Sequence, residues 1–141
     1  LLNPEGFRHA PFSLGGCVLF VKLRQYPGKD RQHIAINTNS LPWCDSGIAG
    51  VAHKPLYSQD GYSDSVELQK WKATTSPGKI VYPEGAEIFV IDGTFRDENG
   101  SYGKGFWLRF PMQAAHSPRT DTGCVIYVKK GGFEYLVPEI A

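Results

Sequence analysis

Short apolar or alternating segments, separated by turn-forming residues, run along the whole chain. These segments cover residues 17–23, 50–57, 65–73, 87–95, 105–110, 123–130 and 133–137. The stretches between them are rich in glycine, proline, asparagine and aspartate, as in "QYPGKD", "YSQDGYSD" and "DENGSYGKG". No stretch keeps the helical period of about 3.6 residues for more than two turns. Short strands at this spacing predict an all-β sandwich or barrel.

The segment "EIFVIDGTF" (87–95) is apolar on both of its faces. Strand alternation places Glu87, Phe89 and Ile91 on one side. Ile88 and Val90 fall on the other side. We therefore expect one face to line an interior and the other to be covered by a second sheet or a second subunit.

One phrase of the sequence occurs twice. "GFRHAPFSLGGCVLFVK" (6–22) and "QAAHSPRTDTGCVIYVK" (113–129) align without a gap at an offset of 107 residues. The identical pairs include Pro4/Pro111, His9/His116, Pro11/Pro118, Gly16/Gly123, Cys17/Cys124, Val18/Val125, Val21/Val128 and Lys22/Lys129. This agreement predicts an internal duplication. Residues 1–32 would be the C-terminal remnant of a first unit, and residues 33–141 a complete second unit.

Composition and charge limit the classes of function. The chain has 141 residues, enough for one core, and its 15 Lys and Arg nearly balance 14 Asp and Glu. This balance argues against a nucleic-acid partner. No apolar run approaches the roughly 20 residues of a membrane span, and no secretory leader is visible. Three cysteines without a C-x-x-C pair predict plain thiols in a reducing cytoplasm.

The longest motif set resembles a known family. "EGAEIFVIDGTFRDENGSYGKGFWLRFPMQAAHSP", followed by "GCVIYVK", resembles the cupin superfamily, specifically the branch of the ChrR-type anti-sigma factors. Residues 33–44, "HIAINTNSLPWC", resemble the segment that opens such a unit. The resemblance implies a cupin fold, which is a double-stranded β-helix or jelly-roll barrel, with extra N-terminal strands from the incomplete first unit.

The N-terminal remnant also predicts association. Its strands cannot close a barrel alone, and unpaired strand edges invite partners. We expect them to pair with the complete barrel of the same chain or to swap into a second chain. A homodimer that forms through these strands is the expected assembly.

The resemblance also implies a metal site, which this sequence leaves incomplete. Many cupins bind one divalent metal through two histidines, a glutamate and a later histidine. Carried over residue by residue, the glutamate falls on Glu87 and the late histidine on His116. The two early histidines fall near Ile80 and Tyr82, and Tyr82 is a doubtful third ligand. We expect no cofactor, with a bound Zn, Fe, Mn or Ni ion as the alternative.

Three histidines and one carboxylate have more than one interpretation. Glu87 and His116 are expected to form a buried hydrogen-bonded pair if no metal binds. His53 is either a solvent-facing residue at a strand edge or a further ligand from a strand that borders the barrel. His9, the duplicate of His116, is expected to be an orphaned ligand position.

A small organic ligand is expected at the mouth of the barrel, where such molecules usually bind. Most of the aromatic residues are expected to be core. The candidate ligand-binding residues are Tyr82, Glu87, Phe89, Trp107 and His116.

These observations leave two functions open, and with them the question of whether the protein is an enzyme. The favoured one is a small-molecule-binding or oligomerisation module with a degenerate metal site. The alternative, implied by the resemblance, is a metal-dependent, dioxygenase-like enzyme for a small ketone or diketone. A remnant without activity is a third reading. Anti-sigma activity is disfavoured, because the helical zinc domain that binds sigma in the ChrR-type factors has no counterpart in this sequence.

Overall fold

The computed structural model describes residues 1–23 and 25–133, and these residues are almost entirely β-structure or irregular. The elements are η1 (Thr38–Ser40), β1 (Cys44–Asp45), β2 (Val51–Ser58), β3 (Ser65–Trp71), β4 (Ile80–Tyr82), β5 (Ala86–Arg96), β6 (Ser101–Gly103), β7 (Trp107–Phe110), β8 (Ala114–His116) and β9 (Cys124–Lys130). The element η1 is a single short 3₁₀ turn. The predicted all-β class is confirmed.

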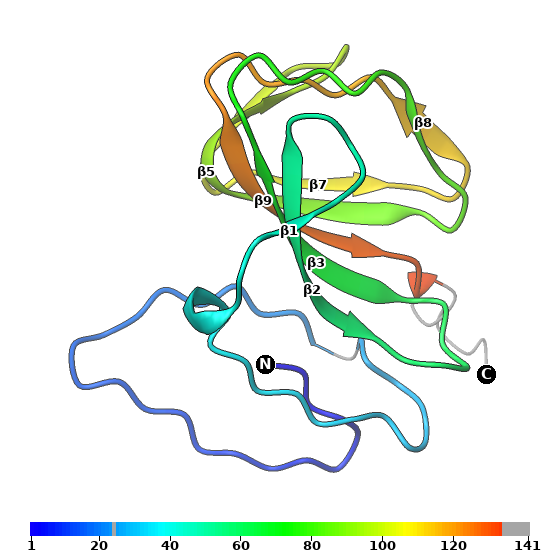
Figure 1. The fold of residues 1–141 in the computed structure, drawn as a ribbon. Coiled ribbons are helices and arrows are strands. Elements are labelled where there is room, and N and C mark those ends of the chain that lie inside the picture. Colours follow the sequence, from blue (N-terminus) through cyan, green and yellow to red (C-terminus); the bar gives the residue numbers. More distant parts are fainter. Residues whose placement is uncertain (24, 134–141) are drawn as a thin grey trace.

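The strands form two antiparallel sheets. The larger sheet has the order β1-β2-β3-β9-β5-β6, with β7 paired to β5 as well, and the smaller sheet contains β4 and β8. Figure 1 shows the strand-rich half curling on itself, so that β8 lies across from β9. The longest strand, β5, is central to the larger sheet, because it pairs with β9, β7 and β6 along its length.

A bend in β5 allows it to change partners. The register with β9 shifts between Val90 and Asp92, which marks a β-bulge. Gly93 follows with a φ of 74° and lies so close to Gly123 that a Cβ would collide with the Gly123 carbonyl oxygen. Only glycine fits this position. Beyond the bend, Phe95 turns fully into the core.

The core lies between the two layers. Its buried members are Val51, Trp71, Tyr82, Ala86, Ile88, Val90, Phe95, Phe110, Cys124, Ile126 and Val128. Ile88 and Val90 face this core, as strand alternation predicts. Phe89 points to the opposite face of β5, where the ring of Phe20 stacks on it with centroids 4.4 Å apart. The expectation that both faces of this strand are covered is therefore supported within one chain.

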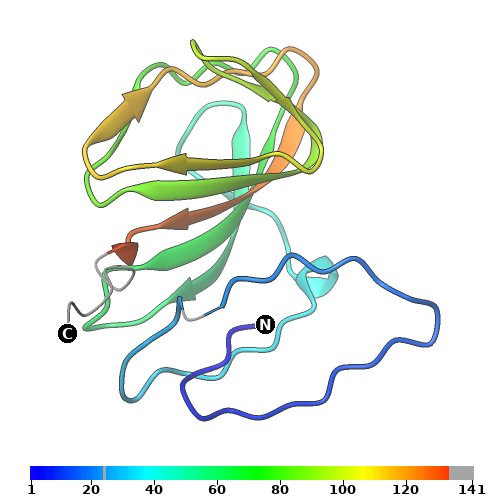
Figure 2. The ribbon, with the colours of Figure 1, turned by 180° about the vertical axis from the view of Figure 1, so that it is seen from behind.

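The N-terminal segment differs from its prediction. Residues 1–23 form a wide, extended loop below the sheets, drawn in blue in Figures 1 and 2. The bridge between Leu2 and Ile34 is the only β-pairing of the described part of this segment, and the expected strand at 17–23 is not formed. The reason lies in its partners: the duplicate strand β9 is hydrogen-bonded on one side to β3 and on the other to β5. Within the described part of the chain, residues 17–23 have no such neighbours.

Two contacts attach the end of this segment to the sheet. Phe20 packs on the outer face of β5 and β9, and Lys22 forms an ion pair with Glu87. The following linker is held by Arg31, whose Nη1 lies 2.7 Å from Asp64 Oδ1. The Arg31 guanidinium also lies over the Tyr62 ring, 3.5 Å from its centroid. The linker is thus fastened to the β2–β3 connection.

The longer strands lie within two residues of their predicted bounds. The two- and three-residue strands β1, β4, β6 and β8 were not predicted, because segments this short show no period. The predicted strand at 133–137 lies outside the described residues except for Phe133. Among the described residues, no helix has the length and apolar character needed to cross a membrane.

Candidate functional site

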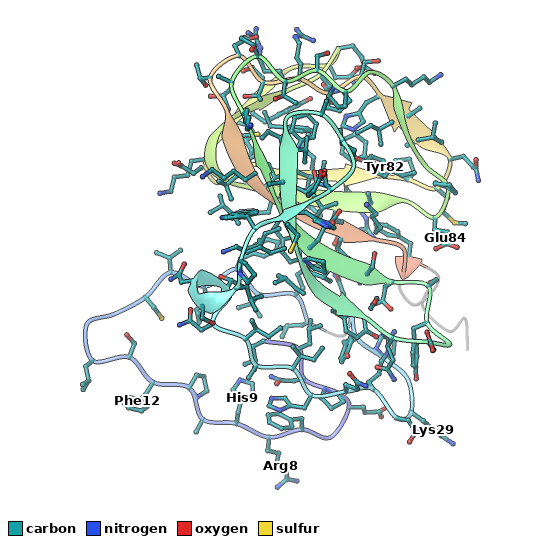
Figure 3. The ribbon with its side chains drawn as sticks, in the orientation of Figure 1. Arg8, His9, Phe12, Lys29, Tyr82 and Glu84 are labelled. Carbon is teal, nitrogen blue, oxygen red and sulfur yellow. The ribbon has the colours of Figure 1, made fainter. Side chains whose placement is uncertain are left out.

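His116 lies at the centre of the interior and both of its ring nitrogens are engaged. Nε2 lies 3.1 Å from the Tyr82 hydroxyl, and Nδ1 lies 3.2 Å from Asp97 Oδ2. An ionised carboxylate can only accept, so Nδ1 carries the proton and Nε2 accepts from Tyr82. The three side chains form a relay in which Tyr82 donates to His116 and His116 donates to Asp97. Figure 3 labels Tyr82 within the strand-rich half.

Aromatic rings fill the space around this imidazole. The ring centroids of Phe110, Tyr82 and Phe95 lie 4.4, 5.4 and 5.9 Å from that of His116. The His116 side chain has an exposed fraction of 0%. A ligand could reach His116 only if these rings moved.

Asp97 is held in its ionised form by four hydrogen bonds. Its Oδ1 accepts from the backbone N–H groups of Asn99 and Gly100, at 2.8 and 3.1 Å, and from the Tyr102 hydroxyl at 3.0 Å. Burial alone would raise the pKa of Asp97, but the Asn99 N–H and the His116 and Tyr102 side chains bring the pKa below its usual value. The carboxylate therefore fixes the tautomer of His116.

Tyr82 is the donor at the other end of this relay. Burial raises the pKa of its hydroxyl, and the negative charges of Glu67 and Asp97 raise it further. Tyr82 consequently stays protonated at neutral pH and can donate to His116.

The predicted pair of Glu87 and His116 is not formed. Glu87 lies on the outer face of β5, where it contacts Lys22 and has its Oε1 3.8 Å from Arg109 Nε. Ala86, which precedes Glu87 in β5, belongs to the core together with Tyr82. The prediction was wrong because strand alternation separates neighbouring residues, and it is Ala86 that faces the interior.

The five candidate ligand-binding residues fall into two groups. Tyr82 and His116 meet inside, whereas Glu87, Phe89 and Trp107 belong to the outer face of the large sheet. Phe89 and Trp107 are paired across β5 and β7, and Trp107 is 48% exposed. The structure brings the first two residues together and places the other three on the opposite face of β5.

The interior does not fit the donor set of a transition-metal centre. Within residues 1–23 and 25–133, no group of three or more His, Cys, Asp or Glu side chains is arranged to hold a metal ion. Both nitrogens of His116 are engaged in hydrogen bonds. Of Ile80, Tyr82 and Ala86, only Tyr82 has a polar side chain, and its phenol is protonated. A transition metal needs several nitrogen, sulfur or carboxylate ligands at once.

A second polar cluster, largely missed from the sequence, crosses the larger sheet. His53 Nδ1 lies 2.8 Å from Glu67 Oε2. Glu67 Oε1 accepts from Gln69 Nε2 at 2.8 Å and from Lys130 Nζ at 3.0 Å, and Gln69 Oε1 accepts from Trp71 Nε1 at 2.9 Å. Of these residues, the sequence singled out only His53, as a possible further ligand. The available signal was the alternation of "SVELQKW" (65–71), which places Glu67 and Gln69 on the same face as the buried Trp71.

The remaining histidines lie in the N-terminal half. The His33 ring stacks on Phe7 with centroids 4.1 Å apart, and His9 Nδ1 lies 3.1 Å from Asn3 Nδ2. His9 is exposed on the N-terminal loop, and Figure 3 shows it well away from Tyr82 in the strand-rich half. His9 thus occupies the position of His116 in the repeated phrase without the tyrosine and aspartate that contact His116.

The comparison with known families agrees with this architecture. Residues 31–134 match the ChrR Cupin-like domain. The chain belongs to this family. The recognition made from the sequence is confirmed, and the match leaves out residues 1–30.

Solved structures show the same fold at low identity. An RmlC-like cupin protein of Ralstonia eutropha JMP134 superposes with a TM-score of 0.64 and 13% identity, over 72% of this chain and 69% of that one. The complex of Rhodobacter sphaeroides SigE with the anti-sigma ChrR superposes with a TM-score of 0.57 and 19% identity, over 64% of this chain and 50% of that one. An acetylacetone dioxygenase of Acinetobacter johnsonii superposes with a TM-score of 0.60 and 13% identity, over 73% of this chain and 75% of that one. No curated protein matches the chain. The cupin fold predicted from the sequence is confirmed.

Proposed function

We propose that this chain is a cupin module for small-molecule binding or assembly that works without a tightly held transition metal. The observation that carries the proposal is the engagement of both His116 nitrogens, one by Tyr82 and the other by Asp97. A metal at His116 would have to displace Tyr82 from Nε2 and would find no second imidazole beside it. The dioxygenase-like alternative needs several such ligands and open coordination positions.

Elemental analysis of protein purified without chelator tests this proposal. We expect less than about a tenth of an equivalent of iron, zinc, manganese or nickel, because structural and catalytic sites normally retain their metal through purification. The variants His116→Ala and Glu87→Ala should leave this value unchanged. Near-stoichiometric metal that is lost in His116→Ala would overturn the proposal and restore the dioxygenase-like alternative.

The assembly part of the proposal concerns the N-terminal segment. We infer that residues 1–32 are the remnant of a first cupin unit and residues 33–141 a complete unit. Supporting this, the segment exposes apolar side chains that its duplicate buries or half-buries in β9; Leu19 and Val21 are 67% and 61% exposed. Their counterparts Ile126 and Val128 are 1% and 2% exposed. A homodimer that covers the face of Leu19 and Val21 is therefore proposed.

The cysteines support a reducing compartment for this module. The three residues are free thiols, with Cys17 and Cys44 exposed and Cys124 buried. Exposed thiols persist in a reducing environment and tend to become oxidised outside it. We therefore propose a cytoplasmic location, which fractionation of the native host would test.

A further inference from the structure

The cluster centred on Glu67 lies on the side of the larger sheet that faces the core. His53 pairs in register with Gln69, and two residues further along each strand Val51 pairs with Trp71. Val51 and Trp71 belong to the core, so strand alternation places His53 and Gln69 on the same side. Polar side chains on such a face cost desolvation energy unless they are fully hydrogen-bonded. Their presence here requires an explanation.

Hydrogen bonds link every member of the cluster. Glu67 accepts from His53, Gln69 and Lys130, and Gln69 accepts from Trp71. Because the carboxylate can only accept, His53 Nδ1 carries a proton and neutral His53 has its lone pair on Nε2. No hydrogen-bond partner of His53 Nε2 is found among the described residues.

The His53 side chain is partly exposed to solvent, unlike that of His116. The side chains of His53 and Lys130 are 25% and 49% exposed, against 0% for His116. The Glu67 side chain between them is 17% exposed, less than either of its two partners. The cluster therefore presents one oriented acceptor nitrogen on a partly exposed side chain.

The charge of Glu67 selects the chemistry that this acceptor can bind. Burial by itself would raise the pKa of Glu67, but the hydrogen bonds from His53 and Lys130 hold the pKa below its usual value. A ligand carboxylate would have no proton for Nε2 and would be repelled by Glu67. A phenol keeps its proton at neutral pH, donates a stronger hydrogen bond than an alcohol, and carries a flat ring that suits a strand surface.

We propose that His53, oriented by Glu67, is the hydrogen-bond acceptor of a binding site for small phenolic compounds. Glu67 acts as a positioning residue, because it fixes the ring and the tautomer of His53 without touching the ligand. The site lies apart from the His116 relay, and its use of an imidazole lone pair does not depend on the metal content of the protein. Failure of the metal analysis and failure of this proposal are therefore separate results.

The test compares two probes that differ by one hydroxyl group. Titration of 4-fluorophenol and of fluorobenzene into the full chain is followed by fluorine NMR. We expect 4-fluorophenol to bind at least about tenfold more tightly, because a site built around a polar group discriminates against an analogue that lacks the matching hydroxyl. Equal affinity of the two probes, or no binding of 4-fluorophenol, would refute the proposal.

Variants assign the acceptor. His53→Phe keeps a ring and removes the nitrogen, and it should weaken 4-fluorophenol binding by about tenfold. The matched variant His9→Phe, on the exposed N-terminal loop, should bind the probe as the parent does. Unchanged binding in His53→Phe would overturn the assignment.

A second variant separates positioning from packing. Glu67→Gln keeps the size of the side chain but can donate as well as accept, so it no longer fixes the tautomer of His53. Nitrogen NMR of His53 should show a proton on Nδ1 in the parent and a mixture of tautomers in Glu67→Gln, with weaker probe binding. A proton on Nε2 in the parent would contradict the proposed geometry, even if His53→Phe fails to fold.

Discussion

Phe20 lies edge-on against Tyr127, with ring centroids 6.0 Å apart, and the two residues occupy equivalent positions of the duplicated phrase. One ring of the N-terminal segment thus packs on the strand that carries the second copy of the phrase. Phe20 also stacks on Phe89, so this single ring covers both strands of the outer face.

Removal of the Phe20 ring should release the N-terminal segment while leaving the core intact. We expect Phe20→Ala to speed proteolytic cleavage within residues 1–23, because the ring contributes packing that the surrounding exposed chain does not replace. The melting temperature should hardly change. Limited proteolysis followed by mass spectrometry checks this, with Phe12→Ala as the control, since Phe12 is 86% exposed. Equal cleavage rates in both variants would show that the segment is not anchored at Phe20.

The proposed dimer should depend on the apolar face of the same segment. Val21→Asp places a charge on that face and should shift the mass measured by light scattering from two chains to one. Val81→Asp, at a half-exposed valine of β4, introduces the same change elsewhere and should leave the dimer intact. A mass of one chain for the parent protein across a wide range of dilution would eliminate the dimer.

Tyr82 should contribute to stability through its hydroxyl group. Tyr82→Phe leaves His116 Nε2 buried without a donor, so we expect a loss of about 1–3 kcal/mol in the free energy of unfolding. Tyr127→Phe is the control, because no hydrogen bond to its hydroxyl is found among the described residues. Chemical denaturation of both variants gives the comparison. A loss in Tyr82→Phe no larger than in Tyr127→Phe would argue against the relay.

Asp97 should make the protein sensitive to acid. Its pKa is lower in the folded protein than the unfolded value of about 3.9, so its stabilising contribution is present above that pH and is lost as the pH falls through the folded pKa. Asp97→Asn should lower stability at neutral pH and flatten the acid side of the stability profile. Denaturation curves at several pH values test this, with the exposed Asp60→Asn as the matched control. A profile of Asp97→Asn parallel to that of the parent would contradict the assignment.

The three cysteines should divide into two classes of reactivity. Burial raises the pKa of Cys124 to about 11, so its thiolate is scarce at neutral pH and its sulfur is shielded. Cys17 and Cys44 are exposed. A thiol reagent should therefore label two cysteines in the native protein and all three after denaturation. Native labelling that is unchanged in the double variant Cys17→Ser and Cys44→Ser would refute this.

Period-two alternation and turn composition identified the longer strands, because these patterns are local. The motif from Glu84 to Pro118 identified the family for the same reason. Locality also explains the errors. The pattern showed that Glu87 and Ile88 lie on opposite faces of β5, but which face was the interior depended on strands distant in the sequence.

The sequence by itself determined the β-class and the cupin family, since each is written in residues close together along the chain. Only the tertiary structure decided that His116 bonds to Tyr82 and Asp97, that Glu87 faces Lys22, and that His53 and Glu67 form a second cluster. These pairs join residues 14 to 65 positions apart, and which of them meet depends on how strands curl and pair across the molecule. Residues 17–23 carry a strand pattern but form no strand for the same reason. Such a pattern becomes a strand only where neighbouring backbones supply hydrogen-bond partners.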